Sequence, residues 1–320
     1  TYTGVTEPAY GKGNYLINNS ADLAINGGSF KFVIPGYQGK KFSHALYVVN
    51  TAGNFTMNGG ELVNDYNNAV RFWATSLNDV KTLTVNNGHI KGLRAIWLQL
   101  PSSNAAQAPK ATININGGKL EGTAIDGTAD SGNILAIYSY SYGQSLENVT
   151  INIKGGEITG DIALTGGSNK NTIETVNISG GVFDGLYGDV YSYGDDKLAS
   201  QSITITGGKF SSIDPMKYMD IEGEIVTLAG NIEVSTDESD TYMLFDGVGT
   251  LDLNNKTIKH TSARTGKNQV MIDVRGKLTV KDGTITTQHI GDNMAWDKCT
   301  EIFYVGFNGT LNLIDATLEH

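Results

Sequence analysis

The chain has 320 residues, 40 of them glycine, and a formal net charge of −10 at pH 7. This acidic balance argues against nucleic acids and anionic membranes as partners, because both attract basic surfaces. The sequence contains no run of 18 apolar residues, which argues against insertion into a membrane. Its single cysteine, Cys299, excludes an intrachain disulfide and leaves the redox compartment open.

The chain begins with a stretch rich in Gly, Tyr and Asn that follows no repeat, and residues 1–20 are predicted to be an N-terminal cap or linker. After it, one eight-residue repeat dominates the sequence: apolar, polar, apolar, polar, a pair or near-pair of Gly, Asn or Asp, any residue, apolar. Ile203–Phe210 (ITITGGKF) shows this pattern clearly. The ten copies begin at Leu23, Phe55, Leu83, Ile113, Ile151, Val176, Ile203, Leu251, Leu278 and Leu311.

The repeat predicts a strand followed by a bend. Its first and third residues face one side because side chains alternate along a strand, and the glycines then allow the backbone to turn. The copies begin 25 to 48 residues apart. This spacing, without the four-stranded blades of a propeller or the Leu/Asn pattern of a leucine-rich repeat, favours a parallel β-helix. We therefore predict an all-β solenoid of about ten or more coils.

A second apolar strand follows the repeat in six of the coils, for example at Ala69–Trp73 (AVRFW) and Ala95–Leu98 (AIWL). Alternation assigns one set of its side chains to the core. The residues predicted to face inward on these strands are Val70, Phe72, Ile96, Leu98, Leu135, Ile137, Ile162, Leu164 and Val190.

The repeat is interrupted at Ser211–Glu224, a segment that contains Pro215 and lies in the longest interval between copies. We expect a boundary here, between a first β-helix block at 21–214 and a second block at 215–320. The second block has Asn-Lys, Asp-Gly and Asp-Ala in place of Gly-Gly. It is expected to continue beyond the chain, because its last coil leaves an apolar edge uncovered and solenoids need capping units.

Segments such as INGGSF, ININGGKL and ITGGKF, together with GGKFSSIDPMKYM and LDLNNKTI, resemble the Gly-Gly repeats of bacterial surface proteins and phage fibre or tailspike proteins. These proteins belong to the right-handed parallel β-helix, pectate-lyase-like, superfamily. The resemblance covers nearly the whole chain after the first 20 residues. It implies a right-handed solenoid at a virion or bacterial cell surface, and a homo-oligomer, with a trimer as the expectation. It implies no single activity, since that superfamily includes lyases, hydrolases, adhesins and inert stalks.

An enzyme of this superfamily needs carboxylates grouped on neighbouring coils. The candidates are Asp161 on one coil and Asp184 and Asp189 on the next. No arginine lies near them in the sequence, and solvated carboxylates on an acidic rod are the interpretation that we favour. The five histidines share no metal-ligand spacing, so no metal or other cofactor is predicted. A polysaccharide lyase or glycoside hydrolase is the alternative function.

A set of aromatic residues alternates with the inward positions of neighbouring coils and is predicted to project outward: Trp73, Trp97, Tyr138, Tyr140, Tyr142, Tyr191 and Tyr193. Rings in a row present flat apolar faces on which sugars can dock, and an exposed apolar patch usually marks an interaction site. Coverage by loops or by sister subunits is the other interpretation. We therefore predict an extracellular structural or adhesive rod whose aromatic flank contacts a glycan or another copy of the chain.

Overall fold

The computed structural model describes residues 14–33, 46–76, 78–100, 109–123, 134–141, 148–164, 175–184, 190–192, 203–210, 224–228, 230–236, 241–262, 269–289 and 300–319. The chain divides into two units, Thr1–Ile203 and Thr204–His320, each described by itself below. All regular structure in the described ranges is β-strand. These ranges contain no helix with the length and apolar character needed to cross a membrane.

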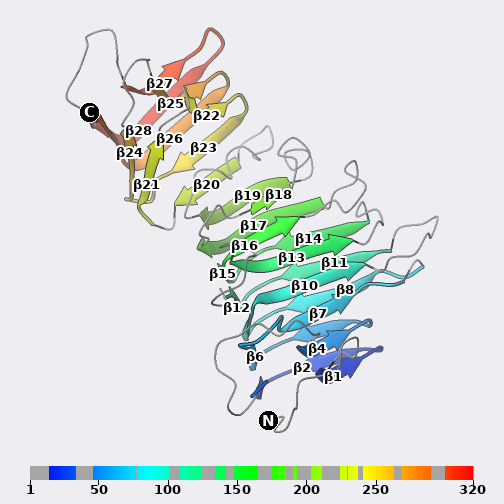
Figure 1. Ribbon diagram of the computed structural model, residues 1–320. Helices are drawn as coiled ribbons and strands as arrows, with labels where there is room; N and C mark the ends of the chain where they lie inside the picture. The colour runs from blue at the N-terminus through cyan, green and yellow to red at the C-terminus, as the bar shows by residue number, and fades with distance from the viewer. Residues whose placement is uncertain are drawn as a thin grey trace. The chain divides into compact units, whose positions relative to one another are not determined.

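The first unit is a parallel β-solenoid, as the sequence predicted, in which each early turn consists of three short strands stacked on those of the next turn (Figure 1). The first sheet takes one strand from each turn, in the order β1 (Asn14–Asn19), β4 (Leu46–Thr51), β7 (Val70–Trp73), β10 (Arg94–Leu100), β13 (Leu135–Ser141), β16 (Asp161–Leu164) and β18 (Val190–Ser192). β1 occupies the end of the predicted cap or linker at 1–20.

Each copy of the repeat supplies the other two strands of its turn. The strand before the glycine corner forms the row β2 (Leu23–Ile25), β5 (Phe55–Met57), β8 (Lys81–Val85), β11 (Ala111–Ile115) and β14 (Val149–Ile153). The strand after the corner forms the row β3 (Ser29–Lys31), β6 (Glu61–Asn64), β9 (His89–Gly92), β12 (Lys119–Gly122) and β15 (Glu157–Thr159). The last strands of both rows, β14 and β15, pair with one longer strand, β17 (Thr175–Asp184).

The predicted number of coils is too high. The described residues of the first unit form about six stacked turns, from β1–β3 to β16–β17, whereas the sequence predicted about ten or more in one solenoid. The sequence count assigned one coil to each of the ten copies of the repeat in both blocks. The last copies lie in the second unit, beyond Ile203.

The core is built from rows of apolar side chains that repeat from turn to turn. Leu83, Ile113 and Ile151 occupy the same register position in β8, β11 and β14, and all three are fully buried. Neighbouring strands lie about 4.8 Å apart, so such side chains stack in contact. Each contributes roughly 1.5–3 kcal/mol when fully buried. This stacking holds the turns together without a second layer of structure.

The inward positions predicted on the first sheet are confirmed wherever their burial is described, at Val70, Phe72, Ile96, Leu98, Leu135, Ile137 and Ile162. The other two, Leu164 and Val190, lie in β16 and β18, but the orientation of their side chains is outside the described part of the structure.

The corner between the two strands of a repeat requires glycine, as Gly118 shows. Its φ is +80°, a conformation that residues with a Cβ rarely adopt. A Cβ at this position would also lie 2.7 Å from the carbonyl oxygen of Gly88 in the preceding turn. That carbonyl accepts a hydrogen bond of 2.8 Å from the amide of Lys119. The glycine therefore allows both the turn and the close stacking of the corners.

The second unit repeats this parallel arrangement. One row consists of β19 (Ile203–Phe210), β20 (Glu224–Leu228), β23 (Val248–Asp252), β26 (Lys277–His289) and β28 (Thr310–Glu319). A second row runs through β21 (Ile232–Thr236) and β24 (Thr257–Ser262) to the later part of β26 and then β28. The third row is a separate sheet of β22 (Thr241–Phe245), β25 (Gln269–Val274) and β27 (Thr300–Val305).

The division into 1–20, 21–214 and 215–320 stays a prediction, because residues 211–223, which contain the expected boundary, lie outside the described ranges. The right-handed winding and the continuation of the second block beyond the chain also stay predictions.

Candidate functional site

The outer side of the first sheet carries a cluster of aromatic and arginine side chains. In β7, Val70 and Phe72 are fully buried, whereas Arg71 and Trp73 alternate with them and are half-buried. The strand register then aligns outward residues across turns: Arg71 pairs with Trp97 of β10, and Trp97 pairs with Tyr138 of β13. Sequence alternation thus placed Trp73, Trp97 and Tyr138 correctly on one side of the sheet.

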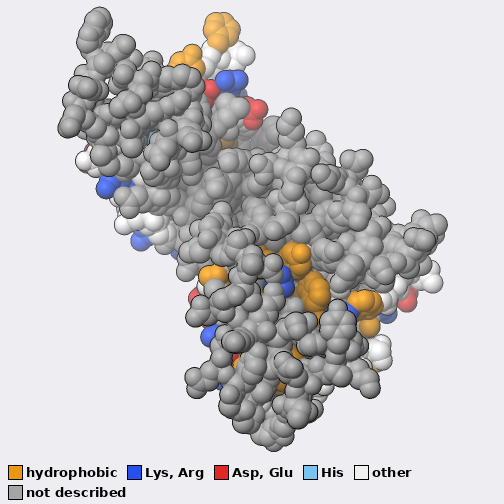
Figure 2. Space-filling model, viewed as in Figure 1, with side chains coloured by type: hydrophobic (Ala, Val, Ile, Leu, Met, Phe, Trp, Pro, Cys, Tyr) orange, Lys and Arg blue, Asp and Glu red, His pale blue; other side chains and the backbone are white. Residues whose placement is uncertain are grey.

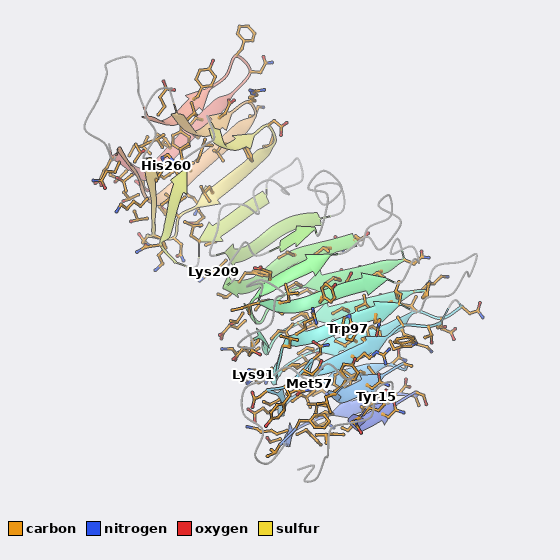
Figure 3. All side chains as sticks on the ribbon, viewed as in Figure 1. Tyr15, Met57, Lys91, Trp97, Lys209 and His260 are labelled. Atoms are coloured by element: carbon orange, nitrogen blue, oxygen red, sulfur yellow. The ribbon has the colours of Figure 1, made fainter. Side chains whose placement is uncertain are left out.

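We name this surface the aromatic–arginine face. It consists of Tyr15, Tyr47, Arg71, Trp73, Arg94, Trp97 and Tyr138. Figure 2 shows hydrophobic side chains together with Lys or Arg side chains near the middle of the visible surface of the first unit. In Figure 3, Tyr15 and Trp97 lie on strands of the first sheet, and Lys91 lies away from them on β9.

Arg71 is the centre of the face. Its guanidinium carbon lies 3.7 Å from the centroid of the Trp73 ring. The rings of Tyr47 and Trp97 also lie within cation–π range, at 5.6 and 5.9 Å. The Nε of Arg71 donates a hydrogen bond of 2.7 Å to Oε1 of Gln99. Each cation–π contact contributes about 0.5–2 kcal/mol, depending on exposure, so these contacts hold the side chain flat against the sheet.

A row of rings continues from this centre toward the N-terminal turn. Tyr47 is 3% exposed, and its ring lies 6.0 Å from that of Trp97 and 5.8 Å from that of Tyr15, almost parallel to the latter. Strict alternation from the inward Val49 would have directed Tyr47 into the core. The amides of Val48 and Val49 both donate to the carbonyl oxygen of Ala69, which is a bulge geometry, and the alternation shifts there.

Sequence reasoning therefore missed Tyr15, Tyr47, Arg71 and Arg94. A local signal for Arg71 was present, because it separates the inward Val70 and Phe72 on the strand that carries Trp73. For Tyr47 no such signal exists, since a bulge cannot be read from these residues. Arg94 packs on the next turn, with its guanidinium carbon 4.4 Å from the centroid of the Tyr138 ring.

The other predicted aromatic residues are only partly placed. Tyr140 lies in β13 opposite Gln99, and Tyr191 lies in β18 opposite Ala163, but the orientation of both rings is outside the described part. Tyr142 and Tyr193 lie outside the described residues altogether. Their part in the face stays a prediction.

The described backbone places two of the three candidate catalytic carboxylates. Asp161 begins β16 in the first sheet, and its side chain is fully buried. Asp184 ends β17, which belongs to another sheet, where it pairs with Thr159. Asp189 lies outside the described residues. Their assignment to catalysis stays a prediction.

A second polar surface lies on the row from β3 to β15, where side chains of opposite charge on neighbouring turns contact one another. Its shortest ion pairs are Lys119 to Glu157 at 2.8 Å and Lys31 to Glu61 at 3.0 Å, and Nε2 of His89 forms a hydrogen bond of 3.0 Å with Oε2 of Glu121. These pairs cross-link successive turns, and the charges of the row largely satisfy one another. We therefore interpret this surface as a stabilising ladder.

The pKa values of the ladder reflect these pairs. Hydrogen bonds from Lys31 and Ser29 lower the pKa of Glu61 below its usual value. Burial raises the pKa of Glu121, but hydrogen bonds and charge from Lys91 and His89 outweigh it, and the net shift is downward.

Among the described residues, no three His, Cys, Asp or Glu side chains lie close enough to hold a metal ion. His260 of β24 is buried in the second unit, with its Nδ1 3.2 Å from the hydroxyl of Thr287. Burial lowers the pKa of His260, which keeps the ring neutral at pH 7.

No protein-family model, curated protein or solved structure matches this chain. The solenoid fold therefore rests on the strand pairings, and the resemblance to pectate-lyase-like, phage fibre and surface proteins stays a prediction. Any functional conclusion rests on the geometry of the aromatic–arginine face.

Proposed function

We propose that this chain is a structural or adhesive solenoid that binds glycans through the aromatic–arginine face. The observation that carries this proposal is the row of half-buried rings aligned across neighbouring turns, with Trp97 between Arg71 and Tyr138 in the register. The C–H groups of pyranose rings pack on such flat apolar surfaces, while hydroxyl groups reach polar neighbours. A solenoid holds the rings rigidly, which reduces the entropy lost when a ligand binds.

The resemblance of the Gly-Gly repeats to bacterial surface and phage fibre or tailspike proteins supports a location outside the cell, at a virion or bacterial surface. There, a glycan of another cell is the ligand available to such a face. Contact with a sister subunit in a homo-oligomer is the competing use of the same rings. A tryptophan substitution would weaken glycan binding in the first case and change the oligomeric state in the second.

A glycan array with the purified chain, followed by titration calorimetry on the strongest ligand, tests the proposal. Trp97→Ala and Trp73→Ala are each expected to weaken binding about tenfold, equivalent to about 1.4 kcal/mol. Tyr304→Ala is the matched control, because Tyr304 is an aromatic residue that is 51% exposed on β27, in the second unit. It should bind as the unchanged chain does.

The proposal is wrong if the unchanged chain binds no glycan, or if both tryptophan variants bind as tightly as it does. A change of oligomeric state in the tryptophan variants, measured by light scattering, without a change in glycan affinity would assign the face to subunit contact. Thermal unfolding of each variant checks that the fold persists.

A further inference from the structure

We propose that copies of this chain stack end to end, with the first turn of one copy (β1, β2 and β3) pairing in parallel with the last turn of another (β27 and β28). In the described ranges, β27 pairs with β25 alone and β28 with β26 alone. Val280 and Ile285 of β26 are fully buried, whereas their partners Leu313 and Leu318 on β28 are 43% and 39% exposed. A strand edge in this state is a template for a further strand.

Exposed apolar side chains are concentrated at this last turn. Ten large hydrophobic residues are exposed in the part of the chain that the structure describes, and six of them lie between residues 304 and 318. The six are Tyr304, Val305, Phe307, Leu313, Ile314 and Leu318. A concentration of this kind marks an interaction site, because scattered single residues would need no explanation.

The first turn of the chain has the spacing that this edge requires. In both turns, four apolar residues pair with fully buried residues of the neighbouring turn and therefore occupy core positions. The residue numbers of the two sets differ by 288 at every position. The sets are Ile17, Leu23, Ile25 and Phe30 in the first turn, and Val305, Leu311, Leu313 and Leu318 in the last. All four positions can therefore pair at once, without an insertion or a bulge.

The first turn is also incompletely covered. Leu23 and Phe30 are half-buried, whereas their register partners Phe55 and Leu62 in the next turn are fully buried. In the described ranges, each strand of this turn pairs only with the turn that follows it. Later copies of the repeat are not available in this way, because a strand such as β5 already pairs with β2 on one side and β8 on the other.

The charges at the two ends are complementary. The register that aligns the apolar residues places Glu319 of one copy opposite Lys31 of the next, whose side chain is 47% exposed. Within the first unit, Lys31 already forms an ion pair of 3.0 Å with Glu61 of the following turn. Glu319 would therefore extend the same ladder by one turn, and opposite charges directly across a strand pair stabilise it.

Such a contact joins two different surfaces, so it leaves a free end on each copy and builds open chains of molecules. Light scattering and sedimentation over a range of concentrations should show an average mass that rises without stopping at a dimer. Leu313→Lys should weaken the association at least about tenfold, because it buries a charge in the new contact. Val80→Lys is the matched control, since Val80 is an apolar residue of the first unit that is 52% exposed, and it should leave the association unchanged.

Cysteine pairing tests the register itself. In a Cys299→Ser background, Ala24→Cys and Asn312→Cys are combined, because both positions are exposed and would lie opposite each other in the stack. Parallel neighbours lie about 4.8 Å apart, which a disulfide can span. Mild oxidation should give a series of covalent dimers, trimers and longer chains. Ser29→Cys combined with Asn312→Cys is the control, since Ser29 lies five residues beyond Ala24, and it should give at most about a tenth of the product.

The possible failures can be distinguished. A chain that stays monomeric at every concentration overturns the inference and leaves the edge of β28 to a different partner. Association that survives Leu313→Lys but is lost in Trp97→Ala would assign the contact to the aromatic–arginine face. Equal yields from the two cysteine pairs would overturn the register. If Leu313→Lys lowers the unfolding temperature, the cysteine pair decides, because it keeps every apolar residue of the contact.

Discussion

The corners of the first unit and the last three corners of the second unit turn the chain with different residues. In the first unit, the sixth residue of each described repeat is a glycine with positive φ, at Gly28, Gly60, Gly88, Gly118, Gly156 and Gly181. In the repeats that begin at Leu251, Leu278 and Leu311, the left-handed residues are Asn254, Asn255, Asp282 and Asp315.

The difference follows from what each corner residue stacks on. A Cβ on Gly60 would lie 2.5 Å from the carbonyl oxygen of Gly28, and one on Gly118 would lie 2.7 Å from that of Gly88. Asn255, in contrast, is exposed, and asparagine adopts positive φ more readily than other residues with a Cβ. Glycine is therefore demanded where a Cβ would overlap the preceding carbonyl, whereas a left-handed conformation alone does not demand it.

The largest loss of stability is expected where a Cβ is added to a corner that stacks on the preceding turn. Gly118→Ala should lower the free energy of unfolding by about 2–4 kcal/mol, because it combines left-handed strain with overlap on the preceding carbonyl. Gly28→Ala has the strain, with φ at +92°, but its nearest contact is the Phe30 ring at 3.4 Å. It should lose about 1–2 kcal/mol. Urea denaturation measures both losses.

Gly27→Ala is the control for this series. No atom lies within 4 Å of a Cβ built at Gly27, and its φ is not positive. The change in unfolding free energy should stay below about 0.5 kcal/mol. Equal losses in all three variants would show that stacking on the preceding carbonyl is not what selects glycine.

The two units should also differ in their response to acid. Burial lowers the pKa of His260 in the folded second unit, whereas the unfolded chain has the usual value of about 6.5. Below that pH the unfolded chain takes up a proton that the folded unit does not, so stability falls as the pH falls through about 6.5. Hydrogen-exchange protection factors of β24 and β26 at pH 7 and pH 5 measure this loss, and His260→Gln should reduce it.

In the first unit, acid reduces folding stability by protonating carboxylates, and this loss of stability begins at lower pH. Glu61 and Glu121 have lowered pKa values when folded, so their contribution is present above the usual value of 4.5 and is lost as the pH falls through their folded values. Exchange protection factors in β6 and β12 should therefore change little between pH 7 and pH 5. An equal loss of protection in both units, or one that persists in His260→Gln, would remove His260 as the cause.

The fold could be predicted from the sequence because the core depends on period-two alternation of apolar residues. This alternation is visible within single strands such as β8 and β11. It was insufficient for the number of turns in the first unit, since similar repeats occur in both units. At the site, alternation identified Trp73 and Trp97 from their inward neighbours. It missed Tyr47, because a bulge between Val48 and Val49 depends on hydrogen bonds to another turn that no local pattern encodes.

A left-handed corner of the second unit should tolerate a change to glycine with little loss of stability. Asn255 has a φ of +59° and an exposed side chain, and its amide donates to the carbonyl of Asp282 in the next turn. Asn255→Gly keeps that bond and suits the conformation, so the unfolding free energy should change by less than about 0.5 kcal/mol. Asn255→Ala should lose about 1 kcal/mol, because alanine tolerates positive φ poorly. If the glycine variant loses as much as the alanine variant, the asparagine side chain itself holds this corner, and the left-handed backbone does not explain its selection.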